Sequence, residues 1–186
     1  MSTLNFMNSI IIHYPFIKNN FYYYLNEKLD NLPQKSLKRR LTLELREIIK
    51  YFNINEYSID IIINNTKSYN IIIYNYNNDK TYDFLMNDYP FYPPKLKING
   101  KDENYYLQIK NKEFRYALFK YKNIDCFCCH SLTCINNWIP TKKMIDIIKQ
   151  FEEFEEITKE LNRKLITEKI VNKYLNSNIN IIEWLY

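Results

Sequence analysis

The chain has 186 residues, of which 46% are hydrophobic and 25% are charged, and its formal net charge is +5. It contains a single glycine, although an average usage of about 7% would give roughly a dozen in a chain of this length. Glycine-rich dinucleotide-binding turns and phosphate-binding loops are therefore excluded, and the modest, scattered positive charge does not predict nucleic-acid binding.

The composition also bears on origin and location. Ala117 is the only alanine, and isoleucine, asparagine, lysine and tyrosine predominate; this bias is typical of a very AT-rich genome and indicates a viral or parasitic source. The longest apolar runs, such as residues 71–73, are far shorter than the ~20 residues that cross a bilayer. Residues 1–20 lack the basic start and the small-residue cleavage site of a secretory signal. We therefore expect a cytoplasmic protein (in the host cytoplasm if viral) with no membrane association and with reduced thiols.

Residues 1–33 are expected to form an N-terminal extension. They mix aromatic and asparagine-rich stretches, including FYYY at 21–24, and end at Pro33. This segment is too apolar to be typical of a disordered tail. We expect it to pack on the domain as an extra helix or strand.

The first clear periodicity predicts a helix that begins at Ser36. Ser36 is a suitable N-cap residue, and Lys38, Arg39 and Arg46 lie off the apolar face, toward solvent. The apolar residues recur at spacings of three and four, as on one face of a helix; they are Leu37, Leu41, Leu45, Ile48, Ile49 and Phe52.

Strands follow this helix. The pattern changes to runs of β-branched and aromatic residues, which lie at 57–63, 69–76 and 82–86. Asparagine-rich turns at 64–68 and 77–79 separate the runs. This order predicts an antiparallel meander, and a short fourth strand is expected at 96–98.

A second helical pattern follows Pro140. Thr141 is a suitable N-cap, and no proline or glycine interrupts the apolar stripe, so we expect one long helix or two helices joined by a kink. The stripe consists of Met144, Ile145, Ile147, Ile148, Phe151, Phe154, Ile157, Leu161, Leu165 and Ile170. Helices on either side of a meander predict an α+β fold with the helices segregated from the sheet.

Residues 89–94, with the sequence YPFYPP, must form a rigid extended turn. Each proline lacks an N–H group and has a fixed φ angle, so the segment fits neither a helix nor a strand interior. It connects the third expected strand to the fourth. Taken alone, it is a proline-stiffened loop.

Four cysteines lie within nine residues of sequence, at Cys126, Cys128, Cys129 and Cys134. Three interpretations are open. The thiols could be small buried hydrophobic groups, or they could bind zinc with help from His130 or His13, although structural zinc sites usually combine two separated ligand pairs. The third interpretation is a nucleophilic thiol.

The order of these features resembles ubiquitin-conjugating enzymes. Members of that family combine a basic first helix, a four-stranded meander, a YPFxPP turn, a catalytic cysteine, a W-x-P turn and C-terminal helices. Here YPFYPP and the Trp138-Ile139-Pro140 turn stand in that order on either side of the cysteines. The resemblance implies a UBC-like core at 34–154 with a four-stranded antiparallel meander, followed by a C-terminal helical extension at 155–186.

The resemblance also implies an enzyme that accepts ubiquitin as a cysteine thioester and transfers it to lysine. If Cys128 is aligned with the isoleucine that precedes the family's catalytic cysteine, Cys129 is the nucleophile, nine residues before Trp138. If Leu132 is aligned with the family's distal leucine, Cys128 is favoured instead. The sequence has no His-Pro-Asn, whose asparagine organises the active-site loop in the family, and the nearest equivalent is Asn123.

The partners that the resemblance implies are ubiquitin, a ubiquitin-activating enzyme and a ubiquitin ligase. The family's basic first helix contacts the activating enzyme, and the equivalent residues here are Lys38, Arg39 and Arg40. The ligase-binding loops correspond to Phe91, Ile139 and Pro140. No cofactor and no metal are expected for this chemistry. The alternative is a catalytically inactive relative, similar to ubiquitin-conjugating variants without the cysteine or to RWD domains, that acts by binding.

Overall fold

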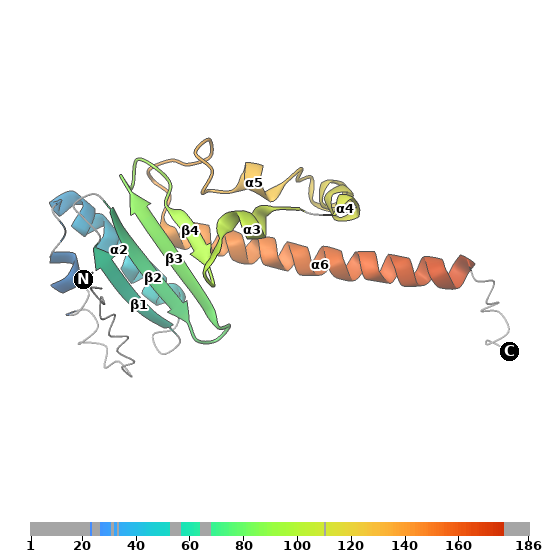
Figure 1. The fold of residues 1–186 in the computed structure, drawn as a ribbon, viewed down its shortest axis with the longest axis horizontal. Helices are drawn as coiled ribbons and strands as arrows, with labels where there is room; N and C mark the ends of the chain where they lie inside the picture. Colours follow the sequence, from blue (N-terminus) through green and yellow to red (C-terminus); the bar gives the residue numbers. More distant parts are fainter. Residues whose placement is uncertain are drawn as a thin grey trace, which may run out of the picture.

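The computed structural model describes residues 23, 27–30, 32, 34–52, 57–63, 68–109 and 111–176, without the side chains at 57, 175 and 176. The elements form an α+β structure in which helices cover one face of an antiparallel sheet (Figure 1). Most of the expected N-terminal extension at 1–33 lies outside the described residues. Of its described residues, Leu29 and Leu32 are buried in the hydrophobic core.

Helix α2 (Lys35–Tyr51) has the apolar face that the sequence predicts. Its buried apolar residues are Leu37, Leu41, Leu45, Ile48 and Ile49. The predicted N-cap at Ser36 is wrong, because the backbone is already helical at Lys35, and the N-cap Gln34 makes no side-chain hydrogen bond. Glu44 also lies on the buried face, with 1% exposure, and the apolar pattern does not predict it.

The sheet contains five antiparallel strands that are neighbours in sequence order. They are β1 (Tyr57–Ile63), β2 (Ser68–Asn75), β3 (Lys80–Asn87), β4 (Lys95–Ile98) and β5 (Lys101–Asp102). The first four confirm the predicted meander. Every second side chain of β2 and β3 is buried, as expected where one face of a sheet packs on a core. Ile71 of β2, for example, lies between Ile61 of β1 and Phe84 of β3.

Strand β5 corrects the four-strand prediction. The two-residue turn Asn99-Gly100 joins it to β4, and these residues have positive φ angles of 50° and 72°. A hairpin turn of this length needs left-handed backbone at both positions, which is why Asn-Gly favours it. The only glycine of the chain therefore closes a hairpin, at a position where a side chain would be strained.

Three helices that the sequence pattern does not predict lie between β5 and Trp138. They are α3 (Glu103–Leu107), α4 (Lys112–Lys122) and α5 (Phe127–His130). Helix α4 packs against the long helix α6 (Met144–Asn176), and its buried residues are Phe114, Ala117 and Leu118. These short helices carry the chain from the sheet to the cysteines.

Helix α6 is one continuous helix of 33 residues. The predicted cap at Thr141 is wrong, because the helix begins at Met144, and the Lys143 N–H donates to the Asp146 carboxylate at 3.0 Å. The helix runs without a break through the boundary expected at residue 155. None of the described helices combines the length and the apolar character that a bilayer crossing requires.

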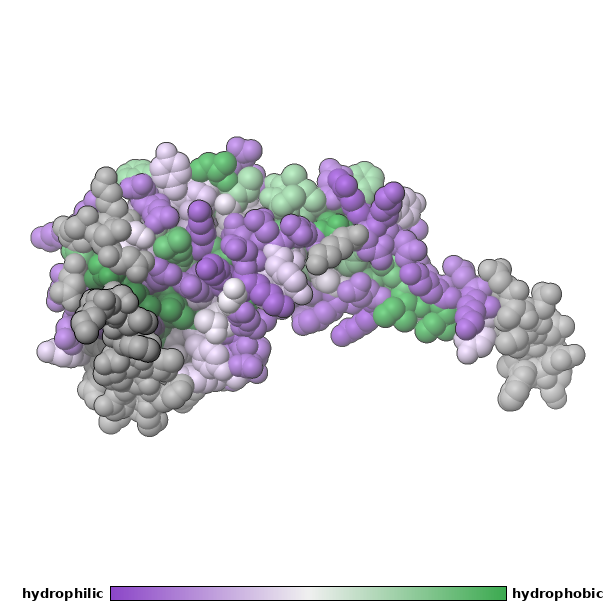
Figure 2. Space-filling view, viewed as in Figure 1, coloured by the Kyte–Doolittle hydropathy of each residue, from purple (hydrophilic) through white to green (hydrophobic). Residues whose placement is uncertain are grey.

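The C-terminal part of α6 extends away from the sheet (Figure 1). The helix is buried on one side as far as Leu161. Beyond it, Ile166, Ile170 and Val171 are 57%, 50% and 46% exposed, and Figure 2 shows apolar surface on this part of the molecule. Of the last two residues of the predicted apolar stripe, Leu165 is half-buried against the core and Ile170 faces solvent.

Candidate functional site

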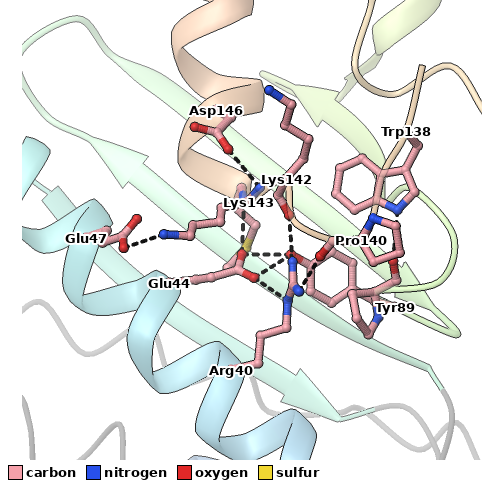
Figure 3. Close-up of polar contacts among 11 residues, drawn as sticks. Arg40, Glu44, Glu47, Tyr89, Trp138, Pro140, Lys142, Lys143 and Asp146 are labelled. Carbon is pink, nitrogen blue, oxygen red and sulfur yellow. Dashed lines mark hydrogen bonds and ion pairs between the residues drawn. The ribbon is translucent and has the colours of Figure 1, made fainter.

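A buried carboxylate connects α2 to the YPFYPP turn and to the start of α6. The Tyr89 hydroxyl lies 2.6 and 2.7 Å from the two carboxylate oxygens of Glu44 (Figure 3). Glu44 also accepts from Arg40 Nε at 2.6 Å and from the Met144 N–H at 3.0 Å. Burial raises the pKa of Glu44, and these hydrogen bonds offset part of the rise. A buried carboxylate that lacks hydrogen-bond donors destabilises the folded state. The folded state therefore keeps all three donors in place around Glu44.

Arg40 continues this network to the W-I-P turn. Its guanidinium donates to the backbone carbonyls of Pro140 and Lys142, the second at 2.6 Å. The side chain is 25% exposed, and its donors are engaged within the protein. We therefore assign Arg40 to holding these segments together. Of the other basic residues expected to contact an activating enzyme, Arg39 is exposed and Lys38 is paired with Asp30.

Trp138 joins the W-I-P turn to the YPFYPP turn through a hydrogen bond. Its indole N–H donates to the Pro90 carbonyl at 2.8 Å. Trp138 itself is 7% exposed, whereas Phe91 and Ile139 are 75% and 51% exposed, and Pro140 is also exposed. The predicted ligase-contact residues therefore lie on two turns that form one surface.

An open groove of about 500 Å³ runs beside this surface. The YPFYPP turn lines one side of it with Tyr92, Pro93 and Pro94, and the segment around Cys134 contributes Thr133 and Ile135. Tyr92 and Ile135 are 57% and 55% exposed. The apolar surface of the turns therefore continues toward residues 126–134, which contain the cysteines.

Three of the four cysteines meet at α5. Cys126 is the N-cap of this helix, and its sulfur accepts a hydrogen bond from the Cys129 N–H at 3.3 Å. The Cys128 sulfur lies 2.9 Å from that of Cys126 and 4.0 Å from that of Cys129. All four cysteines are free, Cys126 and Cys134 are half-buried, and Cys128 and Cys129 are exposed. The interpretation as buried hydrophobic thiols is therefore wrong for Cys128 and Cys129.

Hydrogen bonds among these thiols make Cys126 the most acidic of the three. Partial burial raises the pKa of Cys126, but hydrogen bonds from Cys128 and Cys129 lower it by more, so the net shift is downward. The hydrogen bond to Cys126 raises the pKa of Cys128. Hydrogen bonds to Cys126 and Cys128 raise the pKa of Cys129 to about 12. The family resemblance does not single out Cys126, and the only sign of it in the sequence is the close C-x-C-C spacing.

Two side-chain amides hold helix α5, the cysteine helix, in place. Gln150 of α6 donates to the His130 carbonyl at 2.9 Å and accepts from the Leu132 N–H at 2.7 Å. Asn137 donates to the Cys129 carbonyl at 2.6 Å, which joins the cysteine helix to the W-I-P turn. The sequence does not single out Asn137, because asparagine is frequent throughout the chain.

Asn123 lies at the C-terminal end of α4 and is exposed. Its φ is 55° and its backbone N–H donates to the Phe119 carbonyl at 2.9 Å. Asparagine tolerates this left-handed conformation better than most residues, so the helix end explains an asparagine here. Of the two histidines, His130 is exposed on α5 and His13 lies outside the described residues.

Comparisons of the chain with protein-family models, with curated proteins and with solved structures find no match. Among the described residues, the candidate site consists of three parts: the exposed thiols of Cys128 and Cys129 on α5, the W-I-P turn that follows them, and the YPFYPP turn.

Proposed function

We propose that this chain has a fold and an activity like those of ubiquitin-conjugating enzymes: it accepts ubiquitin as a cysteine thioester and transfers it to lysine. The observation that carries the proposal is the 2.8 Å hydrogen bond from Trp138 to the Pro90 carbonyl. It joins the two most specific motifs of the resemblance, and the exposed Cys128 and Cys129 precede one of them. The order of α2, the meander and α6 supports the same proposal.

The first proposed step is a thioester exchange. A thiolate of this chain attacks the carbonyl carbon of the ubiquitin C-terminus, which the activating enzyme carries as a thioester. A C–S bond to this chain forms, the C–S bond to the activating enzyme breaks, and the released thiolate takes up a proton. Thiols suit the step because a thiolate is both a strong nucleophile and a workable leaving group.

In the second proposed step, a lysine amine attacks the new thioester. A C–N bond forms, the C–S bond breaks, the amine loses a proton, and the cysteine sulfur regains one. The oxyanion of the intermediate is stabilised by hydrogen-bond donors. The resemblance implies Asn123 as the donor, and this side chain is exposed at the end of α4.

Cys129, or Cys128, is the proposed nucleophile. Both are exposed, as a reaction with a second protein requires. The more acidic Cys126 has its sulfur 2.9 Å from that of Cys128. At this separation the Cys126 and Cys128 sulfurs can share one proton.

The two exposed turns are the proposed contact for a ubiquitin ligase, through Phe91, Ile139 and Pro140. These apolar groups lie on backbone that the Trp138 hydrogen bond and the Arg40 network hold fixed. A fixed apolar surface loses little conformational entropy when it binds, which favours its use as a docking site.

A binding module without transfer activity is the second candidate. Hydrogen bonding within the cluster favours it, because it raises the pKa of Cys129 to about 12. At neutral pH that thiol is almost wholly protonated, and the thiolate is the reactive form. In this alternative the turns and the groove bind a partner, and the cysteines carry no ubiquitin.

A thioester assay separates the two candidates. The full chain is incubated with activating enzyme, Mg²⁺-ATP, ubiquitin and a zinc-selective chelator that leaves Mg²⁺ free, and the products are separated on a non-reducing gel. We expect a thiol-sensitive band heavier by one ubiquitin, which is lost in Cys129→Ala. Cys134→Ala is the matched control and should keep the band, because Cys134 lies outside the sulfur cluster.

The alanine series also assigns the nucleophile. A band that is lost in Cys128→Ala but kept in Cys129→Ala would show that Cys128 is the nucleophile. If wild type forms no band while a known conjugating enzyme is charged in the same mixture, transfer activity is contradicted and the binding module remains.

A further inference from the structure

The sulfurs of Cys126, Cys128 and Cys129 all lie within 4.8 Å of one another. Within the described part of the chain, no other group of three or more histidine, cysteine or acidic side chains could hold a metal ion. Cys126 is half-buried and the other two are exposed, so the cluster is open to solvent on one side. Three converging thiols with one open side are a suitable ligand set for a thiophilic metal ion.

The sulfur spacing fits such an ion. Three sulfurs bound to one zinc at about 2.3 Å, in tetrahedral directions, are about 3.8 Å apart. The Cys128 and Cys129 sulfurs are 4.0 Å apart, which is close to that value. The Cys126 and Cys128 sulfurs are 2.9 Å apart and would need to separate by about 1 Å. Side-chain rotation suffices for a change of this size.

The backbone that carries these sulfurs is already held in place. The Cys129 N–H donates to the Cys126 sulfur at 3.3 Å. Asn137 holds the Cys129 carbonyl at 2.6 Å, and Gln150 holds the His130 carbonyl at 2.9 Å. Supporting hydrogen bonds of this kind orient metal ligands and increase affinity.

We propose that Cys126, Cys128 and Cys129 together bind one zinc ion. Each sulfur forms a Zn–S bond and releases its proton to solvent, and a water molecule takes the fourth position on the exposed side. The site lies in one short helix and its N-cap, and Phe127 of this helix is buried in the hydrophobic core. The ion is therefore bound by a folded domain that does not depend on it, contrary to the expectation that no metal is bound.

Zinc binding would also regulate ubiquitin transfer, a consequence that rests on the proposed function. An ion at these sulfurs engages the electron pairs with which Cys128 or Cys129 attacks the incoming thioester. Zinc and ubiquitin would then exclude each other at this site. The zinc-loaded chain should form no thioester, and a chelator should restore it.

Calorimetric titration of the untagged, reduced full chain with Zn²⁺ tests the site without any ubiquitin component. We expect one ion per chain and no binding of Mg²⁺, a hard cation that prefers oxygen ligands. Cys126→Ser, Cys128→Ser and Cys129→Ser should each weaken binding by at least about tenfold, since loss of a group that merely supports a ligand costs that much. Cys134→Ser is the matched control and should bind zinc as wild type does.

Absence of stoichiometric zinc in wild type would overturn the site, and so would unchanged affinity in the three cluster variants. Circular dichroism of each variant verifies that it is folded, as expected for Cys128 and Cys129 because both are exposed. The two proposals fail separately. If one zinc binds but no thioester forms in the presence of chelator, the metal site is supported and the transfer activity is contradicted. If a thioester forms but no zinc binds, the transfer activity is supported and the metal site is contradicted.

Discussion

Glu44 is a nearly fully buried carboxylate on a helix face that is otherwise apolar. Such a residue is tolerated when donors satisfy it, and here Arg40, the Tyr89 hydroxyl and the Met144 N–H do so. These donors come from α2, the YPFYPP turn and α6. A single residue therefore sets the relative positions of three segments that are distant in sequence.

Arg40→Ala should lower the free energy of unfolding by about 3 kcal/mol, because it leaves the buried carboxylate without its cationic partner. Arg39→Ala, at the exposed neighbouring position, is the control and should change stability by less than about 0.5 kcal/mol. Urea denaturation of the two variants measures the difference. Equal losses of unfolding free energy in the two variants would show that the Arg40 hydrogen bonds do not stabilise the contact between α2, the YPFYPP turn and α6.

Glu44 should also make stability depend on pH. Burial raises its pKa above the ordinary value of 4.5, so the folded chain keeps this proton at pH values where the unfolded chain has lost it. The stabilisation from this group is fully present below pH 4.5 and is lost as the pH rises through the folded-state pKa. The free energy of unfolding of wild type, minus that of Glu44→Gln, should therefore fall as the pH rises across this window. A difference that grows with pH would show that Arg40 and Tyr89 dominate over burial.

At the scale of elements, apolar periodicity predicts α2, β1 to β4 and α6, because each carries an apolar face long enough to repeat. It does not predict β5, α3 and α5, which have two, five and four residues. Nor does it predict α4, where only Phe114, Ala117 and Leu118 are buried. Short elements depend on their end residues and on tertiary contacts. Two such signals are readable in the sequence: Asn99-Gly100 as a hairpin turn, and Asn111 as the N-cap of α4, where its side chain accepts from the Glu113 N–H at 2.8 Å.

Gly100→Ala should destabilise the protein by about 1 kcal/mol, since an L-residue is strained in left-handed backbone. The φ of Gly100 is +72°, and an added Cβ would meet nothing within 4 Å, so the cost comes from the backbone alone. Thermal unfolding compares this variant with Lys101→Ala, an exposed neighbour in β5. If the two variants unfold alike, the hairpin does not require its glycine.

At the scale of the whole molecule, the candidate site is made where distant segments meet. The sequence predicts the order of the YPFYPP turn, the cysteines and the W-I-P turn. It does not predict that Arg40 is engaged inside the protein, or that Asn137 holds the Cys129 carbonyl. These contacts follow from the packing of α2 and α6 on the sheet, which no local pattern encodes. The same holds for Cys126, whose acidity depends on how α5 arranges its neighbours.

The most direct test of the central claim is discharge of the thioester to free lysine in a single turnover, followed by intact-mass spectrometry, with Mg²⁺-ATP and a zinc-selective chelator present. We predict that wild type gains the mass of one ubiquitin, and that lysine then removes it and appears on the ubiquitin C-terminus. A variant with Cys126, Cys128 and Cys129 all replaced by serine should gain no thiol-sensitive mass. If wild type gains no ubiquitin while a known conjugating enzyme is charged in the same mixture, the proposed transfer activity is contradicted.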